Sequence, residues 1–273
     1  MQTAPTDSRT IWKLDAARRS EERDELAVEE PLEIRVAGEP LAVTMRSPGQ
    51  DEWLAAGFLL SEGIIGDLGE VSRIYHCGRP GTEEYRNTID VIPAAGHTLD
   101  LGATATSKRG TLTTAACGVC GRRSINDLVE KCQLFGEVGH VSAEIIRNSI
   151  RALRDQQPTF ARTGGVHAAG VYNAVGELLA CCEDLGRHNA VDKAVGALMY
   201  SGEAPAKACL LAVGGRASFE MVQKAAMARI PFLASASAAS TLAVSLADRL
   251  GMTLVGFVRG ETMNLYTHAE RIS

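Results

Sequence analysis

Apolar and polar residues alternate with period two near the start of the chain. Residues 32–36 place Leu, Ile and Val at every second position, and residues 41–45 repeat this beyond the turn Ala37-Gly38-Glu39-Pro40. Such alternation around a glycine-containing turn predicts a β-hairpin. Residues 1–24 are polar and charged without a clear period, so we expect them to form a loose arm.

The pattern then changes to helical spacing. Apolar residues recur at intervals of three and four over residues 51–65, which predicts a helix ending near Gly63. Two further apolar runs, 71–77 and 88–92, read as strands. We expect this first part of the chain to be a small, β-rich α+β portion.

The middle of the chain begins with a small and polar stretch. Residues 102–114 are typical of a mobile loop, and a capping pattern at Ser124 predicts a helix to about Leu134. A second helix is expected over residues 142–157, with Pro158 as its end.

Apolar strands alternate with helices over the rest of the chain, and two of them, 166–172 and 178–182, are expected to pair around the turn at residues 173–176. The expected strands are 166–172, 178–182, 208–213, 232–234 and 252–258, and the expected helices are 189–200, 217–229 and 239–250. Strands separated by helices of about 10–15 residues imply right-handed crossovers and a largely parallel sheet. The sequence thus predicts an α/β class with three parts: a polar arm (1–24), an N-terminal α+β portion (25–140) and an α/β core (141–273).

Composition restricts the function. Hydrophobic residues make up 45% of the 273 positions, which suffices for a buried core. The net charge of −5 gives no overall basic field to hold nucleic acid. Aromatic residues make up only 5% of the chain, which leaves few side chains on which bases could stack. The uncharged stretch 230–247 is interrupted by Pro231 and several serines, and no apolar segment follows Arg18-Arg19. We therefore expect a soluble, cytoplasmic protein without a membrane span or secretory signal.

Charged residues and glycines follow the predicted strands of the core. Ligands bind beyond the carboxyl ends of strands in open α/β sheets, and these residue types suit a phosphate or pyrophosphate. Alternatively, Gly214 and Gly215 only form a tight turn and the arginines only make surface ion pairs. His167, at a strand start, could bind a ligand or satisfy the strand end. The candidate anion-binding residues after the strands are Arg187, His188, Gly214, Gly215, Arg216, Ser235, Ser237, Arg259 and Gly260.

Two structural interpretations concern nearby charged residues. His188 could pair with Asp184 or Asp192 rather than bind a ligand. Glu220 and Lys224 are four positions apart on one predicted helix, so we expect a solvated ion pair between them.

Cysteine usage points to thiol chemistry rather than to disulfides. Seven cysteines are an odd number in a chain of this size, so a disulfide framework is not expected. Cys77, Cys132 and Cys209 read as ordinary buried cysteines, and Cys181-Cys182 as core residues of a strand.

Cys117 and Cys120 form a CxxC motif that allows three interpretations. The pair could supply half of a zinc site, cycle as a dithiol, or present one thiolate as a nucleophile. The sequence contains no second CxxC for zinc, and the predicted helix begins only some residues after the motif. Nearby cations lower a thiol pKa and favour the nucleophile; they are Lys108, Arg109, Arg122 and Arg123.

The chain resembles the FdhD family, the accessory sulfurtransferases of formate dehydrogenase. The resemblance spreads over nearly the whole chain after the N-terminal arm, and the runs around residues 183–196 and 214–226 are far more specific than the CxxC. The matching stretches are GFLLSEGII (57–65), TAACGVCG (114–121), TGGVHAAG (163–170), EDLGRHNAVDKAVG (183–196), GGRASFEMVQKAA (214–226), STLAVSLADRLGMTLVGFVRG (240–260) and MNLYT (263–267).

This resemblance implies a sulfur carrier. Members of the family accept sulfur from a cysteine desulfurase as a cysteine persulfide and pass it to the molybdenum or tungsten bis-guanine-dinucleotide cofactor of formate dehydrogenase. The persulfide position corresponds to Cys117, and Cys120 has a supporting role. The family's cofactor-binding stretch maps onto Phe257, Val258, Arg259, Gly260, Glu261 and Thr262. The resemblance also implies a homodimer with a cytidine-deaminase-like three-layer core.

Deaminase chemistry is not expected despite that fold. It requires His-x-Glu ahead of a Pro-Cys-x-x-Cys, whereas His167 follows the CxxC here, Ala168 and Ala169 follow His167, and no proline precedes Cys117. We therefore expect no catalytic zinc. A cofactor chaperone without sulfur chemistry and a thiol–disulfide oxidoreductase remain alternatives to the sulfur carrier.

Overall fold

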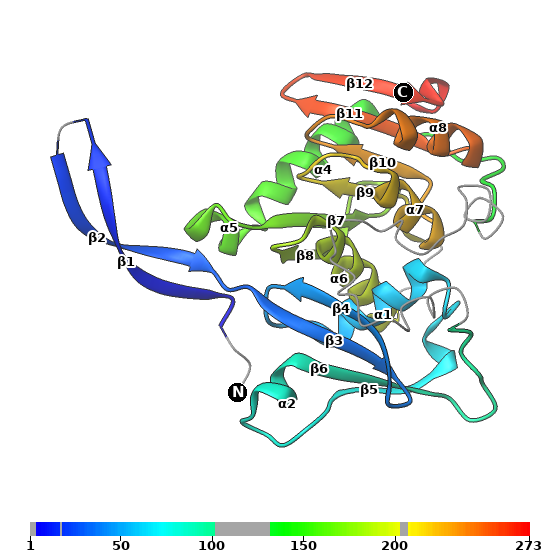
Figure 1. Ribbon diagram of the computed structural model, residues 1–273. Coiled ribbons are helices and arrows are strands. Elements are labelled where there is room, and N and C mark those ends of the chain that lie inside the picture. The colour runs from blue at the N-terminus through cyan, green and yellow to red at the C-terminus, as the bar shows by residue number, and fades with distance from the viewer. Residues whose placement is uncertain (1–3, 17, 102–131, 203–206) are drawn as a thin grey trace.

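A two-stranded ribbon projects from the body of the molecule in the computed structural model, which describes residues 4–16, 18–101, 132–202 and 207–273 (Figure 1). Its strands, β1 (Thr6–Asp15) and β2 (Arg18–Ala27), pair antiparallel along their whole length. The expectation of a loose arm over residues 1–24 is therefore wrong. Backbone hydrogen bonds do not need apolar alternation, and cross-strand contacts such as Lys13 Nζ to Glu22 Oε2 at 3.2 Å connect the polar side chains.

A four-stranded sheet in the order β4-β3-β6-β5 forms most of the N-terminal portion. The predicted hairpin, helix and two strands are all present, whereas the short helix α2 was not predicted. The bounds are β3 (Glu30–Val36), β4 (Glu39–Arg46), α1 (Asp51–Glu62), a 3-10 turn (Leu68–Glu70), β5 (Val71–His76), α2 (Glu83–Asn87) and β6 (Thr88–Pro93).

A six-stranded sheet in the order β12-β11-β10-β9-β7-β8 forms the core. β9, β10 and β11 run parallel, but β7 is antiparallel to both β8 and β9, and β12 is antiparallel to β11. The prediction of a largely parallel sheet is thus wrong at both ends of the strand order. Short turns connect β7 to β8 and β11 to β12, so the strands there run antiparallel. The strands are β7 (His167–Tyr172), β8 (Leu178–Asp184), β9 (Leu210–Val213), β10 (Phe232–Ser235), β11 (Thr253–Arg259) and β12 (Thr262–Thr267).

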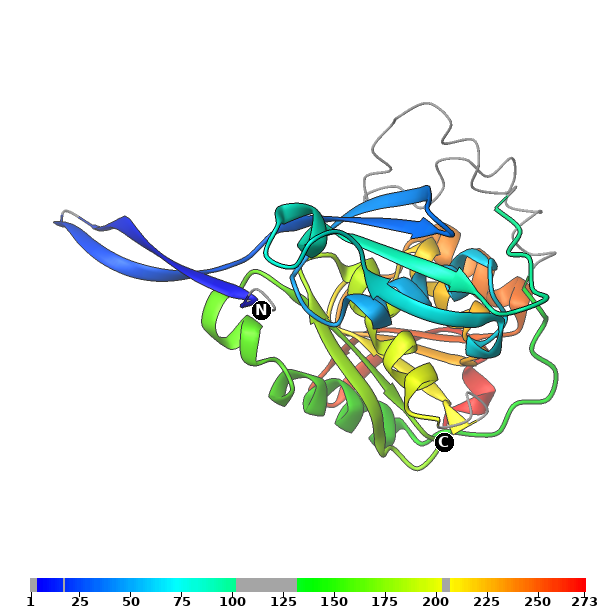
Figure 2. The same ribbon diagram turned by 90° about the horizontal axis from the view of Figure 1, so that it is seen from below.

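Helices cover both faces of this sheet, and Figure 2 shows α4 and α5 on the opposite side of it from the N-terminal portion. Alternate strand residues supply the two apolar faces: Leu210 and Ala212 pack with α4, whereas Leu211 and Val213 pack with α6, α7 and α8. The predicted α/β class with a three-layer core is confirmed. The helices are α4 (Ala143–Asp155), α5 (Pro158–Thr163), α6 (Arg187–Tyr200), α7 (Phe219–Met227), α8 (Thr241–Leu250) and a C-terminal 3-10 turn (Ala269–Arg271).

Two helix predictions need correction. α4 begins as expected, with the Ser142 hydroxyl accepting the Ile145 N–H at 3.2 Å, but it ends at Asp155. Pro158 does not end this helix and instead begins α5, where the missing N–H of proline costs no hydrogen bond. The helix predicted over 124–134 lies largely outside the described residues, and residues 132–134 are not helical.

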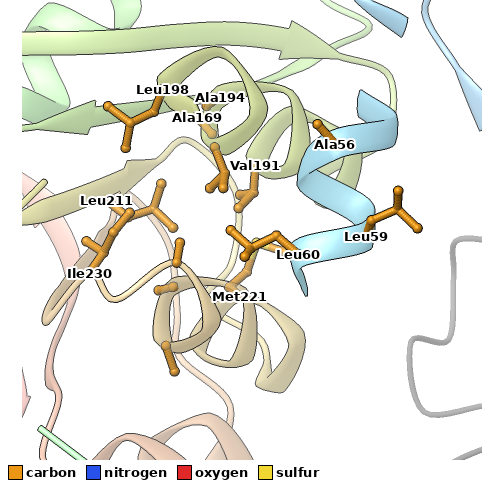
Figure 3. Close-up of a cluster of buried hydrophobic side chains, with 14 of the residues drawn as sticks. Ala56, Leu59, Leu60, Ala169, Val191, Ala194, Leu198, Leu211, Met221 and Ile230 are labelled. Carbon is orange, nitrogen blue, oxygen red and sulfur yellow. The ribbon is translucent and has the colours of Figure 1, made fainter. Parts of the chain in front are cut away.

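The N-terminal portion attaches to the core through α1 and α6. A Cβ added to Gly57 would lie 1.9 Å from the carbonyl oxygen of Asp192, and one added to Gly196 would lie 2.0 Å from that of Trp53. Figure 3 shows Ala56 and Leu60 of α1 beside Val191 of α6 in the buried cluster. The two glycines permit an approach that a side chain on either helix would prevent.

Buried charges accompany this apolar contact. The Lys193 ammonium lies 2.7 Å from the Asp184 carboxylate and donates to the carbonyl oxygen of Ser47 at 2.8 Å. Arg46, fully buried, donates two hydrogen bonds to Asp51 at 2.9 and 3.0 Å. The Lys193–Ser47 hydrogen bond joins the N-terminal portion to the core, whereas the Arg46–Asp51 pair lies within the N-terminal portion.

Candidate functional site

Four strands of the core sheet end at the same edge. β8 is antiparallel to β7, which is antiparallel to β9, so β8 runs parallel with β9, β10 and β11. The prediction that these strand ends share an edge is confirmed, and β7 and β12 begin there (Figure 1). We call this edge the rim; it comprises residues 184–188, 214–218, 235–237 and 257–262.

His188 lies in the first turn of α6 and is held by a carboxylate. Its Nε2 lies 3.4 Å from Oε2 of Glu220, and the Ser218 hydroxyl donates to the same oxygen at 2.8 Å. The His188 contact, with the Ser218 hydrogen bond, lowers the pKa of Glu220 to about 2. Glu220 is the partner of His188, in place of the two aspartates considered from the sequence.

Lys224 does not pair with Glu220 either. Its ammonium donates to both carboxylate oxygens of Asp192 at 2.7 Å, and both side chains are buried. Burial raises the pKa of Asp192, and the nearby Lys224 charge opposes that rise. The predicted solvated ion pair is therefore wrong, because tertiary contact with α6 overrides the spacing along α7.

Arg187, His167 and Gly215 meet at the centre of the rim. A Cβ on Gly215 would lie 3.4 Å from Nδ1 of His167 and 3.7 Å from Cδ of Arg187. Burial, followed by the charges of Arg187 and His188, lowers the pKa of His167, so this imidazole is neutral at pH 7. Within the described part of the chain, the buried Nε of Arg187 has no hydrogen-bond acceptor. Such a donor suits an anion.

Gly214 and Arg216, the neighbours of Gly215, are exposed on the rim. The carboxyl end of β9 is therefore accessible to solvent, and the exposed Arg216 guanidinium lies beside it. This arrangement brings all the predicted residues of the β8 and β9 ends to one place.

The stretch from Phe257 to Thr262 turns from β11 into β12. Phe257 adopts a left-handed conformation (φ +50°) at an irregularity in the pairing of the two strands. The Arg259 guanidinium lies 5.2 Å from the centre of the Phe257 ring, and its Nε donates to the carbonyl oxygen of Ala236 at 3.3 Å. Arg259 is thereby held near the end of β10 while remaining exposed.

The other four predicted residues of this stretch contribute differently. The Val258 side chain is buried in the cluster under α4, so it is not available to a ligand. Glu261 faces Arg147 of α4 at 3.5 Å, and the Thr262 hydroxyl donates to the carbonyl oxygen of Arg259 at 3.1 Å. Gly260, exposed with φ +53°, forms the turn between the strands.

A pocket of about 400 Å³ adjoins the rim between α4, α5 and the start of β7. Most of its lining could not be predicted from the sequence, because nothing in the apolar periodicity distinguishes these positions from ordinary helix ends. The lining includes Leu153, Arg154, Gln157, Phe160, His167 and Gly214.

Cys117 and Cys120 lie outside the described residues, as do the cations that flank them in the sequence. The other cysteines form no disulfide; Cys132 and Cys182 are buried, and Cys77, Cys181 and Cys209 are half-buried. Burial raises the pKa of Cys181 to about 11 and that of Cys182 to about 12, so both are protonated at neutral pH. Protonated thiols are poor nucleophiles.

Two absences concern only the residues that the structure describes. No group of three or more His, Cys, Asp or Glu side chains is placed to hold a metal ion there. Over the same residues, no helix combines the length and apolar character needed to cross a membrane.

The fold and the rim define a class: a mixed α/β protein that gathers arginines, glycines and helix starts at the carboxyl edge of its larger sheet. The chain belongs to the FdhD/NarQ family, whose sequence profile matches residues 27–273. The predicted family membership is thereby confirmed.

Individual relatives cover almost the whole chain. The sulfur carrier protein FdhD of Anaeromyxobacter dehalogenans (strain 2CP-C) is 51% identical over 256 residues, covering 92% of this chain and 89% of the relative. The sulfur carrier protein FdhD of Mycobacterium tuberculosis (strain H37Rv) is 46% identical, covering 98% of this chain and 99% of that one. A crystal structure from Desulfotalea psychrophila, assigned as a formate dehydrogenase accessory protein, matches with a TM-score of 0.78 and 25% identity over 99% of this chain and 100% of that chain.

Proposed function

We propose that this protein carries sulfur for the maturation of formate dehydrogenase. It accepts sulfur on Cys117 from a cysteine desulfurase and transfers it to the molybdenum or tungsten bis-guanine-dinucleotide cofactor. The observation that supports this most directly is the rim, an edge suited to pyrophosphate in a chain whose relatives are named as sulfur carriers. The high pKa of the Cys181 and Cys182 thiols makes these two residues poor sulfur carriers.

The first transfer is a thiolate exchange. The Cys117 thiolate attacks the outer sulfur of the desulfurase persulfide, the sulfur–sulfur bond of that persulfide breaks, and the desulfurase cysteine leaves as a thiolate. Cys117 then carries the persulfide. This step needs no added oxidant or reductant.

The second transfer delivers sulfide to the cofactor. The Cys120 thiolate attacks the inner sulfur of the Cys117 persulfide, the outer sulfur leaves with both bonding electrons, and a Cys117–Cys120 disulfide forms. An external dithiol then reduces this disulfide. The cofactor is bound meanwhile through its phosphates by the rim, with Arg259, Arg187 and Arg216 as the cations.

The first test is intact mass after incubation with a cysteine desulfurase and free cysteine. We expect the wild type to gain sulfur that a thiol reductant removes, and Cys117→Ala to gain none. A wild type that gains no sulfur while still binding guanine nucleotide would overturn sulfur transfer and favour the cofactor chaperone.

The second test separates binding from loading. Arg259→Ala should weaken guanine-nucleotide binding and leave sulfur loading intact, whereas Arg79→Ala, in the N-terminal portion, should change neither. Equal nucleotide affinity in Arg259→Ala and the wild type would remove Arg259 from the site. The cytoplasmic location stays a prediction. The homodimer that the resemblance implies also stays a prediction, and light scattering would test it by measuring the mass of the protein in solution.

A further inference from the structure

Buried hydrogen bonds join the end of β4 to the turn that precedes α6. The Ser47 hydroxyl accepts the Leu185 N–H at 3.0 Å, and the Ser47 N–H donates to the Asp184 carboxylate at 3.1 Å. The Ser47 carbonyl oxygen accepts from the Lys193 ammonium at 2.8 Å. The hydroxyl, the N–H and the carbonyl of Ser47, a residue of the N-terminal portion, thus all bond to the core.

Asp184 and Asn189 complete this contact from the side of the core. The Asp184 carboxylate also accepts the Gly186 N–H at 2.8 Å and the Asn189 amide at 3.0 Å. The same amide donates to the Met45 carbonyl oxygen at 2.7 Å, and its oxygen accepts from the Thr44 hydroxyl at 3.1 Å. Asp184, Asn189 and Thr44 are buried, and a satisfied network of this kind rigidifies the backbone that it joins.

The turn leads directly into Arg187, the first residue of α6. The two N–H groups before it, those of Leu185 and Gly186, are both held by side-chain oxygens, from Ser47 and from Asp184. The Nε atom of Arg187 is buried without an acceptor among the residues that the structure describes. The course of the backbone into this rim cation is therefore set in part by the N-terminal portion.

We propose that Ser47 is a positioning residue for the rim: it holds the turn from which Arg187 meets phosphate, and so links nucleotide binding to the contact between the N-terminal portion and the core. This rests on the proposed function, which assigns nucleotide phosphates to the rim. Ser47 acts through the Leu185 N–H rather than by touching the nucleotide. Because such linkage is reciprocal, nucleotide binding strengthens the contact of the N-terminal portion with the core.

The test is a double-mutant cycle in the full-length protein, with guanosine 5′-diphosphate titrated by calorimetry. Ser47→Ala should weaken binding about fivefold, the effect of one typical hydrogen bond. In a protein that already carries Arg187→Ala, where Arg216 and Arg259 still supply cations, Ser47→Ala should have no further effect on affinity. An equal loss in both backgrounds would overturn the positioning role, as would an unchanged affinity in Ser47→Ala alone.

Ser61→Ala is the matched control. The Ser61 hydroxyl is also buried, and it donates to Asp192, farther along α6, at 2.7 Å, so it joins the same two parts of the molecule. This variant should lower the melting temperature as Ser47→Ala does, yet bind guanosine diphosphate like the wild type. A loss of affinity as large as that of Ser47→Ala would mean that any loosening of the interface has this effect, and Ser47 would have no positioning role.

Thr44→Val provides the test if Ser47→Ala does not fold. It removes the hydroxyl that bonds to Asn189 while keeping a side chain of similar shape. We expect weaker nucleotide binding in this variant too, and only while Arg187 is present. Unchanged affinity in a folded Thr44→Val protein would overturn the linkage.

These titrations separate the positioning role from the proposed function. A wild type that binds no guanosine diphosphate would overturn the rim as a phosphate site, and the role of Ser47 with it. A wild type that binds the nucleotide, combined with an effect of Ser47→Ala that does not depend on Arg187, would overturn the role of Ser47 alone.

Discussion

The two faces of the core sheet are packed in different ways. On the α4 side, buried apolar residues such as Ile146, Ile150 and Phe232 make the contact. On the α6 side, apolar packing is accompanied by buried ion pairs, including Asp192 with Lys224. The α4 face depends mainly on apolar area, with one buried hydrogen bond from the Tyr172 hydroxyl to the Ser149 carbonyl at 2.8 Å, whereas the α6 face combines area with buried ion pairs.

This difference shows how one sheet serves two purposes. Apolar packing is non-directional and tolerates small shifts between layers. Buried polar pairs favour a single arrangement, since any shift leaves a charge without its partner. The N-terminal portion packs on the α6 side, and its placement relative to the rim is thus determined by groups such as Ser47 and Ser61, which bond to Lys193 and Asp192.

The largest effect is expected when the charged face loses one partner. Lys224→Met leaves Asp192 buried without its ammonium, and we expect a loss of about 4 kcal/mol in the free energy of unfolding. Urea denaturation measures it. Combining Lys224→Met with Asp192→Leu should recover part of the loss, although the Ser61 hydroxyl loses its acceptor.

The exposed pair Lys13 and Glu22 provides the matched control. Lys13→Met in this pair should change stability little, because water surrounds both groups. Equal losses in Lys13→Met and Lys224→Met would show that burial does not distinguish these pairs.

A smaller effect is expected on the apolar face. Ile146→Ala removes fully buried carbon atoms under α4, and we expect it to cost about 3 kcal/mol, with Ile146→Val costing about 1 kcal/mol. The two variants should change unfolding without changing how the N-terminal portion is held. Protease sensitivity of the α1–α6 contact under native conditions would reveal an effect there, against this expectation.

The next smaller loss of stability is expected at the glycine contact between α1 and α6. Gly57→Ala forces the helices apart, since the new Cβ would lie 1.9 Å from a carbonyl oxygen, and we expect a cost of about 2 kcal/mol by thermal denaturation. Gly136→Ala, where an added Cβ meets nothing within 4 Å, is the control. A tolerated Gly57→Ala would mean that this interface adapts more readily than its ion pairs suggest.

The smallest effect concerns Glu220 at the rim, and it depends on pH. The folded pKa of about 2 lies below the ordinary 4.5, so its ionisation stabilises the fold above pH 4.5 and that contribution is lost as the pH falls towards 2. Glu220→Gln should therefore lower the free energy of unfolding by about 1 kcal/mol at pH 7, a value that allows for the partial exposure of Glu220. The loss should become progressively smaller below pH 4.5. A constant difference between pH 7 and pH 3 would contradict this assignment.

Elements with a strong pattern could be predicted from the sequence, and elements without one could not. The hairpin β3–β4 shows alternation, and α1 shows helical spacing. β1 and β2 carry charged residues on both faces, and β12 is mostly exposed, so neither offers a buried apolar face to recognise. The pairing of β7 with β8 around a short turn was predicted and is confirmed, whereas the antiparallel pairs β7–β9 and β11–β12 were not predicted.

The candidate site divides in the same way. Residues that follow strands, such as Gly215 and Arg187, were found because the rule about strand ends is general. Gln157 was not, since an amide before Pro158 reads as the end of a helix and only the folded chain shows it buried. Lys224 was assigned to Glu220 by sequence spacing, whereas its partner Asp192 is 32 residues away.

The polar contacts between the N-terminal portion and the core also bear on the order of synthesis. Ser47 bonds to a residue 146 positions later, and the Ser61 carbonyl accepts from Gln223, 162 positions later. At about 5–20 residues per second, a ribosome releases the first partner on the order of ten seconds before the second exists. During that interval the N-terminal portion exposes the apolar surface of α1 that α6 later covers.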